Sequence, residues 1–272
     1  MFRYHLIRFA MNVVRLILLV RIRVYGRENI PAGGAYVVAL NHMSVADTPI
    51  LLLSFPVVEW RFFAGEKWRG HPIYGPIMAW LGAIYINRRE ADRRALKEAL
   101  EALESGKVFG LAPEGSRSKE GALKPAKEGA AYLASRADVP VLPVGLVNSD
   151  KLFANANRLR PTTIEVHIGE PFTLPDVNGR ARGPVLSAYT HLIMVKIAAL
   201  LPERYHGAYK DSSALAALLA GKDPWPYCLE GVAQGSRGAG EQGGRGAGEQ
   251  GSRKAARGQA GGRWRSGGNR LE

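Results

Sequence analysis

A histidine and an aspartate with the spacing of a proton-transfer pair lie in the segment Asn41–Asp47, which reads NHMSVAD. The segment follows a predicted strand, Ala35–Leu40, and precedes a predicted helix, Thr48–Phe55. A separation of five residues lets His42 in a loop meet a carboxylate on the opening turn of the helix. The carboxylate would keep one ring nitrogen protonated and leave the other free as a general base. A purely structural hydrogen bond, or a helix cap at Asp47, is the alternative interpretation.

A second polar segment, Ala112–Ser118 (APEGSRS), also follows a predicted strand, Lys107–Ala112. It offers a backbone turn at Gly115, two hydroxyls and the guanidinium of Arg117, which together suit a phosphate group. Glu114 is expected to hold this arginine or a substrate hydroxyl. A polar turn with one solvated arginine explains the same residues.

Two further segments complete the set of candidates. Gly82–Arg88 (GAIYINR) is a strand-like run that ends in Arg88 and Arg89, which suit either the same phosphate or a solvated edge. Val139–Gly145 (VPVLPVG) has no titratable side chain, so it predicts a wall for an apolar ligand or a segment of the core. Its two prolines predict an irregular or edge strand, because proline cannot donate to a ladder.

The middle of the chain alternates β-rich runs with helical patterns, which predicts an α/β fold with a single mixed sheet flanked by helices. Sites in such folds are built at strand ends, where the polar segments lie. We expect strands at Ala35–Leu40, Val57–Ala64, Ala83–Asn87, Lys107–Ala112, Val139–Val147 and Thr163–Ile168, and further helices at Asp92–Leu103, Ala126–Ala137 and Val185–Leu201.

The first residues, Phe2–Val20, read as an amphipathic helix, and we assign 1–24 to a membrane-associating unit. A polar stripe of four side chains runs beside a broad apolar face: His5, Arg8, Asn12 and Arg15. Such a helix suits a membrane interface. A core-packed helix with a solvated stripe is the alternative. No stretch reaches the ~18–20 uninterrupted apolar residues of a membrane-spanning helix.

Composition limits the class of protein. The chain has 272 residues, of which 46% are hydrophobic, a net charge of +13 and a single cysteine, Cys228. This excludes global disorder, a disulfide scaffold and a multi-thiolate zinc site. The charge implies an anionic partner: a membrane surface, nucleic acid or a phosphorylated substrate. Residues 231–272 carry the tandem repeat GSRGAGEQ–GGRGAGEQ, which predicts a disordered Arg/Gly-rich tail after a folded domain over 25–230.

The four segments in this order resemble the glycerolipid acyltransferases, the family that includes 1-acylglycerol-3-phosphate acyltransferase. That family shows N-H-x-S-x-x-D, G-x-x-x-x-x-R, Pro-Glu-Gly-Thr/Ser-Arg-Ser and Val-Pro-x-x-Pro-Val blocks, which stand here as NHMSVAD, GAIYINR, PEGSRS and VPVLPV. The resemblance runs from Tyr25 to Pro171. Many relatives have a lysine where this chain has Gly65, so no role is carried to that position.

The resemblance implies a role for each matching position. His42 would be the general base and Asp47 its orienting partner. The residues implied to bind substrate are Arg88, Glu114, Gly115, Ser116 and Arg117 around the glycerol phosphate, with Pro140 and Pro143 shaping the acyl or acceptor pocket.

The reaction that the resemblance implies is transfer of a fatty acyl group from a thioester, acyl-CoA or acyl-ACP, to the free hydroxyl of a lysophospholipid. The expected acceptor is 1-acylglycerol 3-phosphate and the expected product is phosphatidic acid. No metal and no cofactor besides the thioester co-substrate are expected. The expected partners are the two substrates, acyl carrier protein as one form of the donor, and the cytoplasmic face of the cell membrane, with peripheral or monotopic attachment.

Three alternatives stay open. The same chemistry on glycerol 3-phosphate or another lysolipid or glycolipid fits the same motifs. A nucleic-acid-binding protein would explain the charge and the tail, but the body has no recognisable nucleic-acid-binding motif, so nucleic acid is not the expected partner. A catalytically inactive lipid-binding protein is disfavoured by the intact His42, Asp47, Glu114 and Arg117.

Overall fold

The computed structural model describes residues 2–56, 59–87, 92–177 and 181–231. Met1–Ala233 form one compact unit. The described helices are α1 (Phe2–Ile17), α2 (Asp47–Ser54), α3 (Tyr74–Trp80), α4 (Arg93–Glu104), α5 (Gly129–Ala137), α6 (Leu152–Ala156), α7 (Pro184–Ala198) and α8 (Ser213–Leu219). The strands are β1 (Val20–Tyr25), β2 (Val37–Leu40), β3 (Trp60–Gly65), β4 (Ala83–Ile86), β5 (Val108–Leu111), β6 (Val141–Val147) and β7 (Thr162–Ile168).

Seven strands of the described ranges form one mixed sheet in the order β1-β7-β6-β2-β5-β3-β4. The five strands from β6 to β4 run parallel, whereas β7 is antiparallel to β6 and β1 is parallel to β7. The predicted α/β class and single mixed sheet are confirmed. Because β2 and β5 are parallel neighbours, the loops that follow them emerge side by side at one edge of the sheet.

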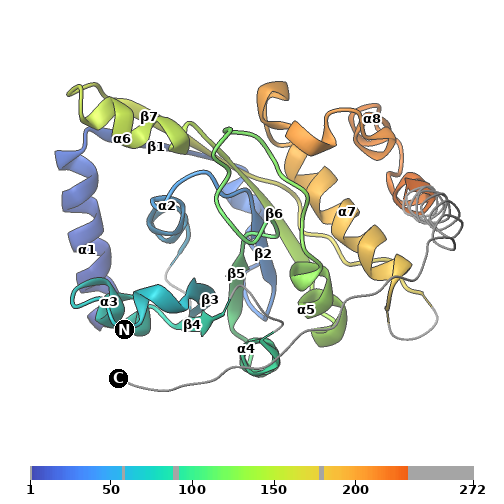
Figure 1. The fold of residues 1–272 in the computed structure, drawn as a ribbon, viewed down its shortest axis with the longest axis horizontal. Coiled ribbons are helices and arrows are strands. Elements are labelled where there is room, and N and C mark those ends of the chain that lie inside the picture. Colours follow the sequence, from blue (N-terminus) through green and yellow to red (C-terminus); the bar gives the residue numbers. More distant parts are fainter. Residues whose placement is uncertain (1, 57–58, 88–91, 178–180, 232–272) are drawn as a thin grey trace, which may run out of the picture. The chain divides into compact units, whose positions relative to one another are not determined.

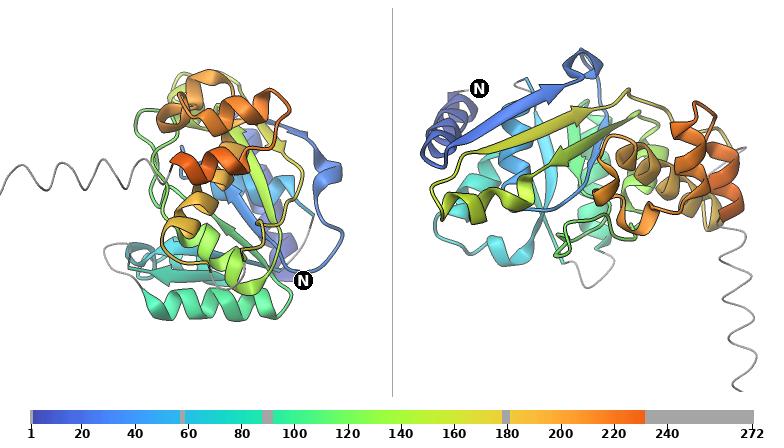
Figure 2. Two further views of the ribbon diagram at one scale, coloured as in Figure 1. Left: turned by 90° about the vertical axis from the view of Figure 1, so that its right-hand side faces the viewer. Right: turned by 90° about the horizontal axis from the view of Figure 1, so that it is seen from above.

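Helices cover both faces of the sheet (Figures 1 and 2). One face packs against α4, α5 and α7, and the other packs against α1 and α2. Alternate residues of β2 serve the two cores, with Val37 on one face and Val38 on the other. All residues of β2, β5 and β6 are buried, as expected of strands covered on both sides. This rigid centre carries the polar loops.

The boundary predicted between a helix and a folded domain at residues 24 and 25 is wrong. Helix α1 ends at Ile17, and the next six residues after the turn, VRIRVY, form β1 beside β7. Leu19 in the turn has a positive φ of 53°, which ends the helix. The alternation of Val20, Ile22 and Val24 with arginines has the period of two of a strand. Tertiary pairing with β7 therefore draws these residues into the sheet.

The prediction of an edge or irregular strand for the two prolines is also wrong, because β6 lies inside the sheet between β7 and β2. Pro143 directs its carbonyl toward β7, where it accepts a hydrogen bond from the Gly169 amide at 3.0 Å. The β6–β7 pairing stops at Ile168 and resumes only as a bridge to Phe172. The missing proline N–H therefore faces a gap in the ladder and costs no hydrogen bond.

Helix α1 turns Arg8 and Arg15 toward the protein, whereas His5 is exposed. Arg8 donates to the carbonyls of Leu52 and Phe55 at the end of α2, and Arg15 donates to the Val20 carbonyl. Exposed apolar side chains cover the opposite side: Leu6, Phe9, Val13, Val14, Leu16 and Ile17, with Phe9 68% and Ile17 72% exposed. The helix thus packs against the core through Ile7, as the alternative expects, while most of its apolar side chains stay exposed, which the alternative does not expect. No helix in the described part of the chain has the length and hydropathy to cross a membrane.

The predicted tail over 231–272 lies outside the described residues beyond Gly231. The other predicted strands and helices are present, with their ends shifted by a few residues. The first two residues of the predicted strand Val57–Ala64 lie outside the described ranges. The elements that the sequence reading did not predict are β1, α3, α6 and α8.

Candidate active site

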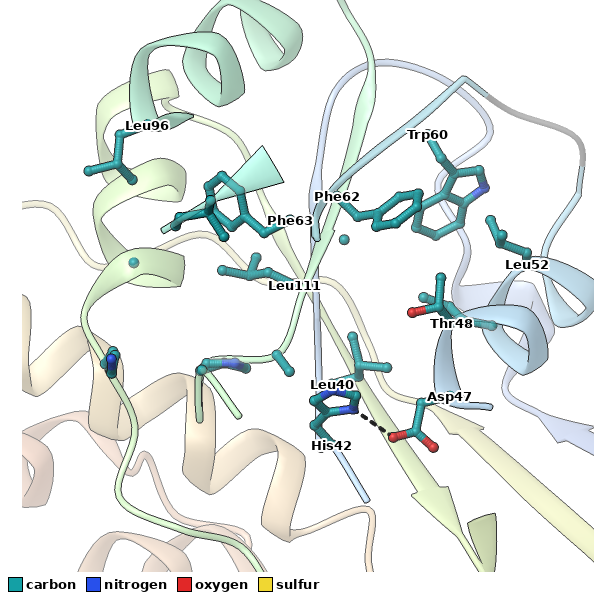
Figure 3. Close-up of a pocket in the computed structure, with 18 of the residues that line it drawn as sticks. Leu40, His42, Asp47, Thr48, Leu52, Trp60, Phe62, Phe63, Leu96 and Leu111 are labelled. Carbon is teal, nitrogen blue, oxygen red and sulfur yellow. Dashed lines mark hydrogen bonds and ion pairs between the residues drawn. The ribbon is translucent and has the colours of Figure 1, made fainter. Parts of the chain in front are cut away.

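His42 and Asp47 form a direct pair at the carboxyl end of β2 (Figure 3). The His42 Nδ1 and the Asp47 Oδ2 are 2.8 Å apart. A carboxylate can only accept, so Nδ1 carries the hydrogen and Nε2 keeps its lone pair. The imidazole is partly exposed, with 19% of its side-chain surface accessible, whereas Asp47 is 1% exposed. The predicted pairing of these two residues is confirmed in its geometry.

The same Asp47 oxygen also fixes the loop that carries the histidine. Oδ2 accepts hydrogen bonds from the backbone amides of Met43 at 2.7 Å and Ser44 at 2.8 Å. Asp47 is the first residue of α2, and it does not cap that helix. Its Oδ1 is buried with no hydrogen-bond partner among the described residues. One carboxylate thus closes the loop from Met43 to Asp47 and orients the imidazole.

Glu114 joins this loop to the one that follows β5. Its Oε1 accepts from the His42 amide at 2.9 Å and its Oε2 from the Lys124 amide at 3.0 Å. The residue is 4% exposed, and burial raises the pKa of the carboxyl above its usual value while the two amide hydrogen bonds oppose the rise. The Ser118 amide also connects the two loops, because it donates to the His42 carbonyl at 2.8 Å. Glu114 therefore bonds to backbone groups rather than to Arg117.

Ser116 and Arg117 in this second loop are exposed, whereas Ser118 is buried. The Lys124 ammonium donates to the Ser116 Oγ at 2.6 Å and to the Arg117 carbonyl at 3.1 Å. Gly115 has a φ of +68°, in the left-handed region, and a Cβ there would lie 3.2 Å from Lys127 Cδ. The positive φ therefore favours glycine at this turn, and the Lys127 side chain lies close against it.

Residues 203–209, far along the chain, form hydrogen bonds with the backbone of this loop. The Leu123 amide donates to the Tyr205 carbonyl at 2.8 Å, and the Leu123 carbonyl accepts from the Ala208 amide at 2.9 Å. The Tyr209 hydroxyl accepts from the Ala126 amide at 3.2 Å. Gly207 has a φ of +50°, and a Cβ there would lie 2.2 Å from the Leu123 carbonyl oxygen. Residues 203–209 thus fix the backbone next to Lys124, whose amide donates to Glu114.

A largely apolar cavity of about 350 Å³ opens beside the imidazole. In Figure 3, Trp60 and Phe62 lie on one side of it and Phe63 and Leu96 on the other, with His42 at one end. The pairing of β3 with β5 stops at Phe62 opposite Gly110. Gly110 leaves room for the Trp60 ring, from which a Cβ would be 3.1 Å away. This cavity has the size and lining expected of a ligand site.

The structure brings together only part of the predicted site. His42, Asp47 and Gly115 line the cavity, and Glu114 lies directly behind His42. Pro140 and Pro143 are not among the described lining residues, because Pro143 lies in β6, on the other side of β2, and Pro140 directly precedes that strand. Arg88 lies outside the described residues.

The sequence reading missed three features of this site. One is Lys127, which lines the cavity, and another is Lys124, which bonds to the second loop. The third is the aromatic pair Phe62 and Phe63 on β3. A sequence signal for the lysines exists: the run LKPAKEG follows the PEGSRS block within the same loop.

Comparison with known proteins now defines the class. Residues 21–147 match the family model described as Acyltransferase. The chain is 28% identical to the 1-acyl-sn-glycerol-3-phosphate acyltransferase of Borreliella burgdorferi over 49% of this chain and 54% of that protein. It is 24% identical to the enzyme of the same name from Bacillus subtilis over 70% of this chain and 94% of that protein.

A solved structure is similar as well. The crystal structure of the 1-acyl-sn-glycerophosphate acyltransferase of Thermotoga maritima matches with a TM-score of 0.59 and 28% identity, over 72% of this chain and 78% of that one. The match to the Borreliella protein spans only about half of that protein's length. Over residues 21–147 the chain is similar to the glycerolipid acyltransferases, and this similarity supports the predicted class of enzyme, an O-acyltransferase.

Proposed function

We propose that this protein transfers a fatty acyl group from an acyl thioester to the free hydroxyl of 1-acylglycerol 3-phosphate, producing phosphatidic acid. The single observation that supports the reaction type is the His42–Asp47 pair at the end of an apolar cavity. The names of the Borreliella and Bacillus relatives support the acceptor. The thiol carrier of the donor is coenzyme A or acyl carrier protein.

The mechanism follows from the tautomer that Asp47 selects. The Nε2 of His42 takes the proton of the acceptor hydroxyl as its oxygen attacks the thioester carbonyl. The tetrahedral intermediate collapses, the carbon–sulfur bond breaks, and the thiolate leaves with the proton that the imidazolium returns. Asp47 stabilises the imidazolium between these two proton transfers. General-base catalysis of this kind is typically worth ~10²–10⁴-fold in rate.

The cavity holds the acyl chain of the donor in this proposal. Its walls are the aromatic and aliphatic side chains of β3, β5 and α2, which are suited to a hydrocarbon chain. Because the apolar wall begins beside His42, a chain lying in it leaves its carbonyl carbon near Nε2. The acceptor approaches from the side of the second loop.

The proposal also places the protein at a membrane surface, on its cytoplasmic face. Support comes from α1, where apolar side chains are exposed and Arg8 and Arg15 are turned into the protein. An exposed apolar face of this size on a helix is typical of an interfacial helix. Both substrates carry hydrocarbon chains, so attachment to the bilayer delivers them to the cavity. Replacing Phe9 and Ile17 with serine is expected to reduce sedimentation with anionic liposomes, while Leu219→Ser on α8 leaves it unchanged.

The first experiment measures thiol release from a long-chain acyl thioester with 1-acylglycerol 3-phosphate as acceptor. Release by the wild type that requires the acceptor, and its loss in His42→Ala but not in His71→Ala, is the expected result. His71 is the matched control because it lies outside the cavity and its Nδ1 accepts only amides of its own turn. Retained release in His42→Ala would disprove the mechanism. Release with glycerol 3-phosphate or monoacylglycerol alone would move the proposal to that acceptor.

A further inference from the structure

The cavity beside His42 has one permanent positive charge among its described lining residues, and that charge belongs to Lys127. The two acidic groups that line it already accept hydrogen bonds from other parts of the protein. Asp47 bonds to His42 and to two amides. Asp92 caps α4 by accepting from the Ala95 amide at 3.0 Å. An anionic ligand group that enters this cavity therefore has a single cationic partner.

Lys127 is held in place by the turn that also positions the base. Its backbone amide donates to the Pro113 carbonyl at 2.8 Å. Its aliphatic stem lies over Gly115, within 3.3 Å of the place where a Cβ would be for Cδ and Cε, and within 3.7 Å for Nζ. Glu114, the residue between Pro113 and Gly115, accepts a hydrogen bond from the His42 amide. The same short turn thus holds the backbone of Lys127 and, through Glu114, the backbone of His42.

The other cations of the loop are placed differently. Arg117 is exposed, as Lys127 is, but it is not among the described residues that line the cavity. The Lys124 ammonium bonds to the Ser116 hydroxyl and the Arg117 carbonyl. Neither residue presents its charge to the space next to His42.

We propose that Lys127 binds the phosphate of the acceptor and so places the acceptor hydroxyl at His42. The inference rests on the proposed function, and it assigns the phosphate contact to a residue outside the four motifs. A charge-assisted hydrogen bond from the ammonium to a phosphate oxygen provides the attraction. Lys127 bonds to Pro113, and the next residue, Glu114, bonds to His42. In this proposal the two contacts set the separation between the ammonium that binds the acceptor phosphate and the imidazole that takes the proton of the acceptor hydroxyl.

The test uses Lys127→Met, which keeps the aliphatic stem over Gly115 and removes the charge. Steady-state kinetics compare 1-acylglycerol 3-phosphate with uncharged monoacylglycerol, each against acyl-CoA and against an acyl-pantetheine that lacks the nucleotide phosphates. We expect KM for the phosphorylated acceptor to rise about 10–100-fold, the size of a lost hydrogen bond to a charged group. KM for both donors and for monoacylglycerol stays within about twofold. Lys127→Arg restores most of the affinity, and Lys119→Met, an exposed lysine of the same loop, has no effect.

A binding measurement separates this inference from the proposed function. Glycerol 3-phosphate is expected to raise the Tm of the wild type and of Lys119→Met, and to leave that of Lys127→Met unchanged. This readout requires no acyl transfer, so it remains valid if the wild type fails to acylate any acceptor. An equal rise in all three proteins, or none in the wild type, would overturn the inference. A higher KM for acyl-CoA with an unchanged KM for the acceptor would assign Lys127 to the donor instead and overturn it as well.

Discussion

Asp47 and Glu114 are two buried carboxylates that contact the same histidine in different ways. Asp47 reaches the imidazole itself, whereas Glu114 reaches the backbone amide of His42 from the neighbouring loop. Asp47 uses one oxygen for three donors, and Glu114 uses one oxygen for each of two amides. Both are removed from solvent, at 1% and 4% exposure.

The difference separates chemical activation from positioning. A carboxylate on the ring sets which nitrogen holds the proton and stabilises the imidazolium. A carboxylate on the backbone sets where the ring is and makes no hydrogen bond to the ring itself. Changes at Asp47 should therefore affect the rate of the chemical step most, and changes at Glu114 should affect folding and geometry.

The largest effect is expected for Asp47→Asn. The amide oxygen at the Oδ2 position can still accept from Met43, Ser44 and His42 Nδ1, and the NH₂ takes the buried Oδ1 position, which has no partner among the described residues. The neutral amide no longer stabilises the imidazolium that forms when His42 takes the proton. We expect kcat to fall about 10²–10⁴-fold with a modest change in KM. Single-turnover thiol release measures the step directly. A fall in kcat of less than tenfold would show that Asp47 does not activate the imidazole, and it would contradict the distinction between the two carboxylates.

A smaller loss of rate is expected for Glu114→Gln. Its amide oxygen can accept one of the two backbone donors, which leaves the other facing an NH₂ group. Loss of one buried hydrogen bond costs about 1–3 kcal/mol of unfolding free energy, and we expect kcat to fall about tenfold, in the lower part of the range for a misplaced base. Urea unfolding and steady-state kinetics provide both numbers. An increase confined to KM for the phosphorylated acceptor would instead support the substrate-binding role implied by the family.

The anchor behind Glu114 can be weakened without touching the site. Gly207→Ala places a Cβ against the Leu123 carbonyl oxygen, so the backbone beside Lys124 must move. We expect a destabilisation of about 1–3 kcal/mol and a several-fold lower kcat. Gly221→Ala is the matched control, because its φ is also positive, at +73°, but nothing lies within 4 Å of the new Cβ. Equal kinetics in the two variants would exclude coupling between residues 203–209 and the base.

The smallest effect concerns pH. Burial raises the pKa of Glu114 in the folded protein, so the folded state holds more protons than the unfolded state between the ordinary glutamate pKa of 4.5 and the raised pKa. Stability contributed by this group is present below pH 4.5 and is lost as the pH rises through the folded pKa. The difference in unfolding free energy between the wild type and Glu114→Gln should therefore fall with rising pH, by at most ~1.4 kcal/mol per pH unit. A flat difference across this window would contradict the raised pKa.

Local sequence was enough to predict the elements whose signals are short-range. The β-rich runs that became β2, β4, β5, β6 and β7 were identified, as was the His42–Asp47 pair, because a strand, a loop and a helix start fix their spacing. Strand β1 was read as part of a helix, since VRIRVY follows an amphipathic helix directly and its partner, β7, lies far along the chain. The position of Pro143 inside the sheet could not be predicted either, because the gap in the ladder belongs to the partner strand.

The sequence by itself predicted the fold class, the resemblance to the acyltransferases and the pairing of His42 with Asp47, since these depend on residue types at fixed short spacings. Tertiary structure decided which charges reach the cavity. Arg117 and Lys127 are both cations of one loop, and only the fold of that loop over Gly115 directs Lys127 to the space beside His42. Tertiary structure also decided that Arg8 faces α2 and that Glu114 faces the backbone. Contacts between residues distant in sequence are fixed by packing and hydrogen bonding in three dimensions, and no local pattern encodes them.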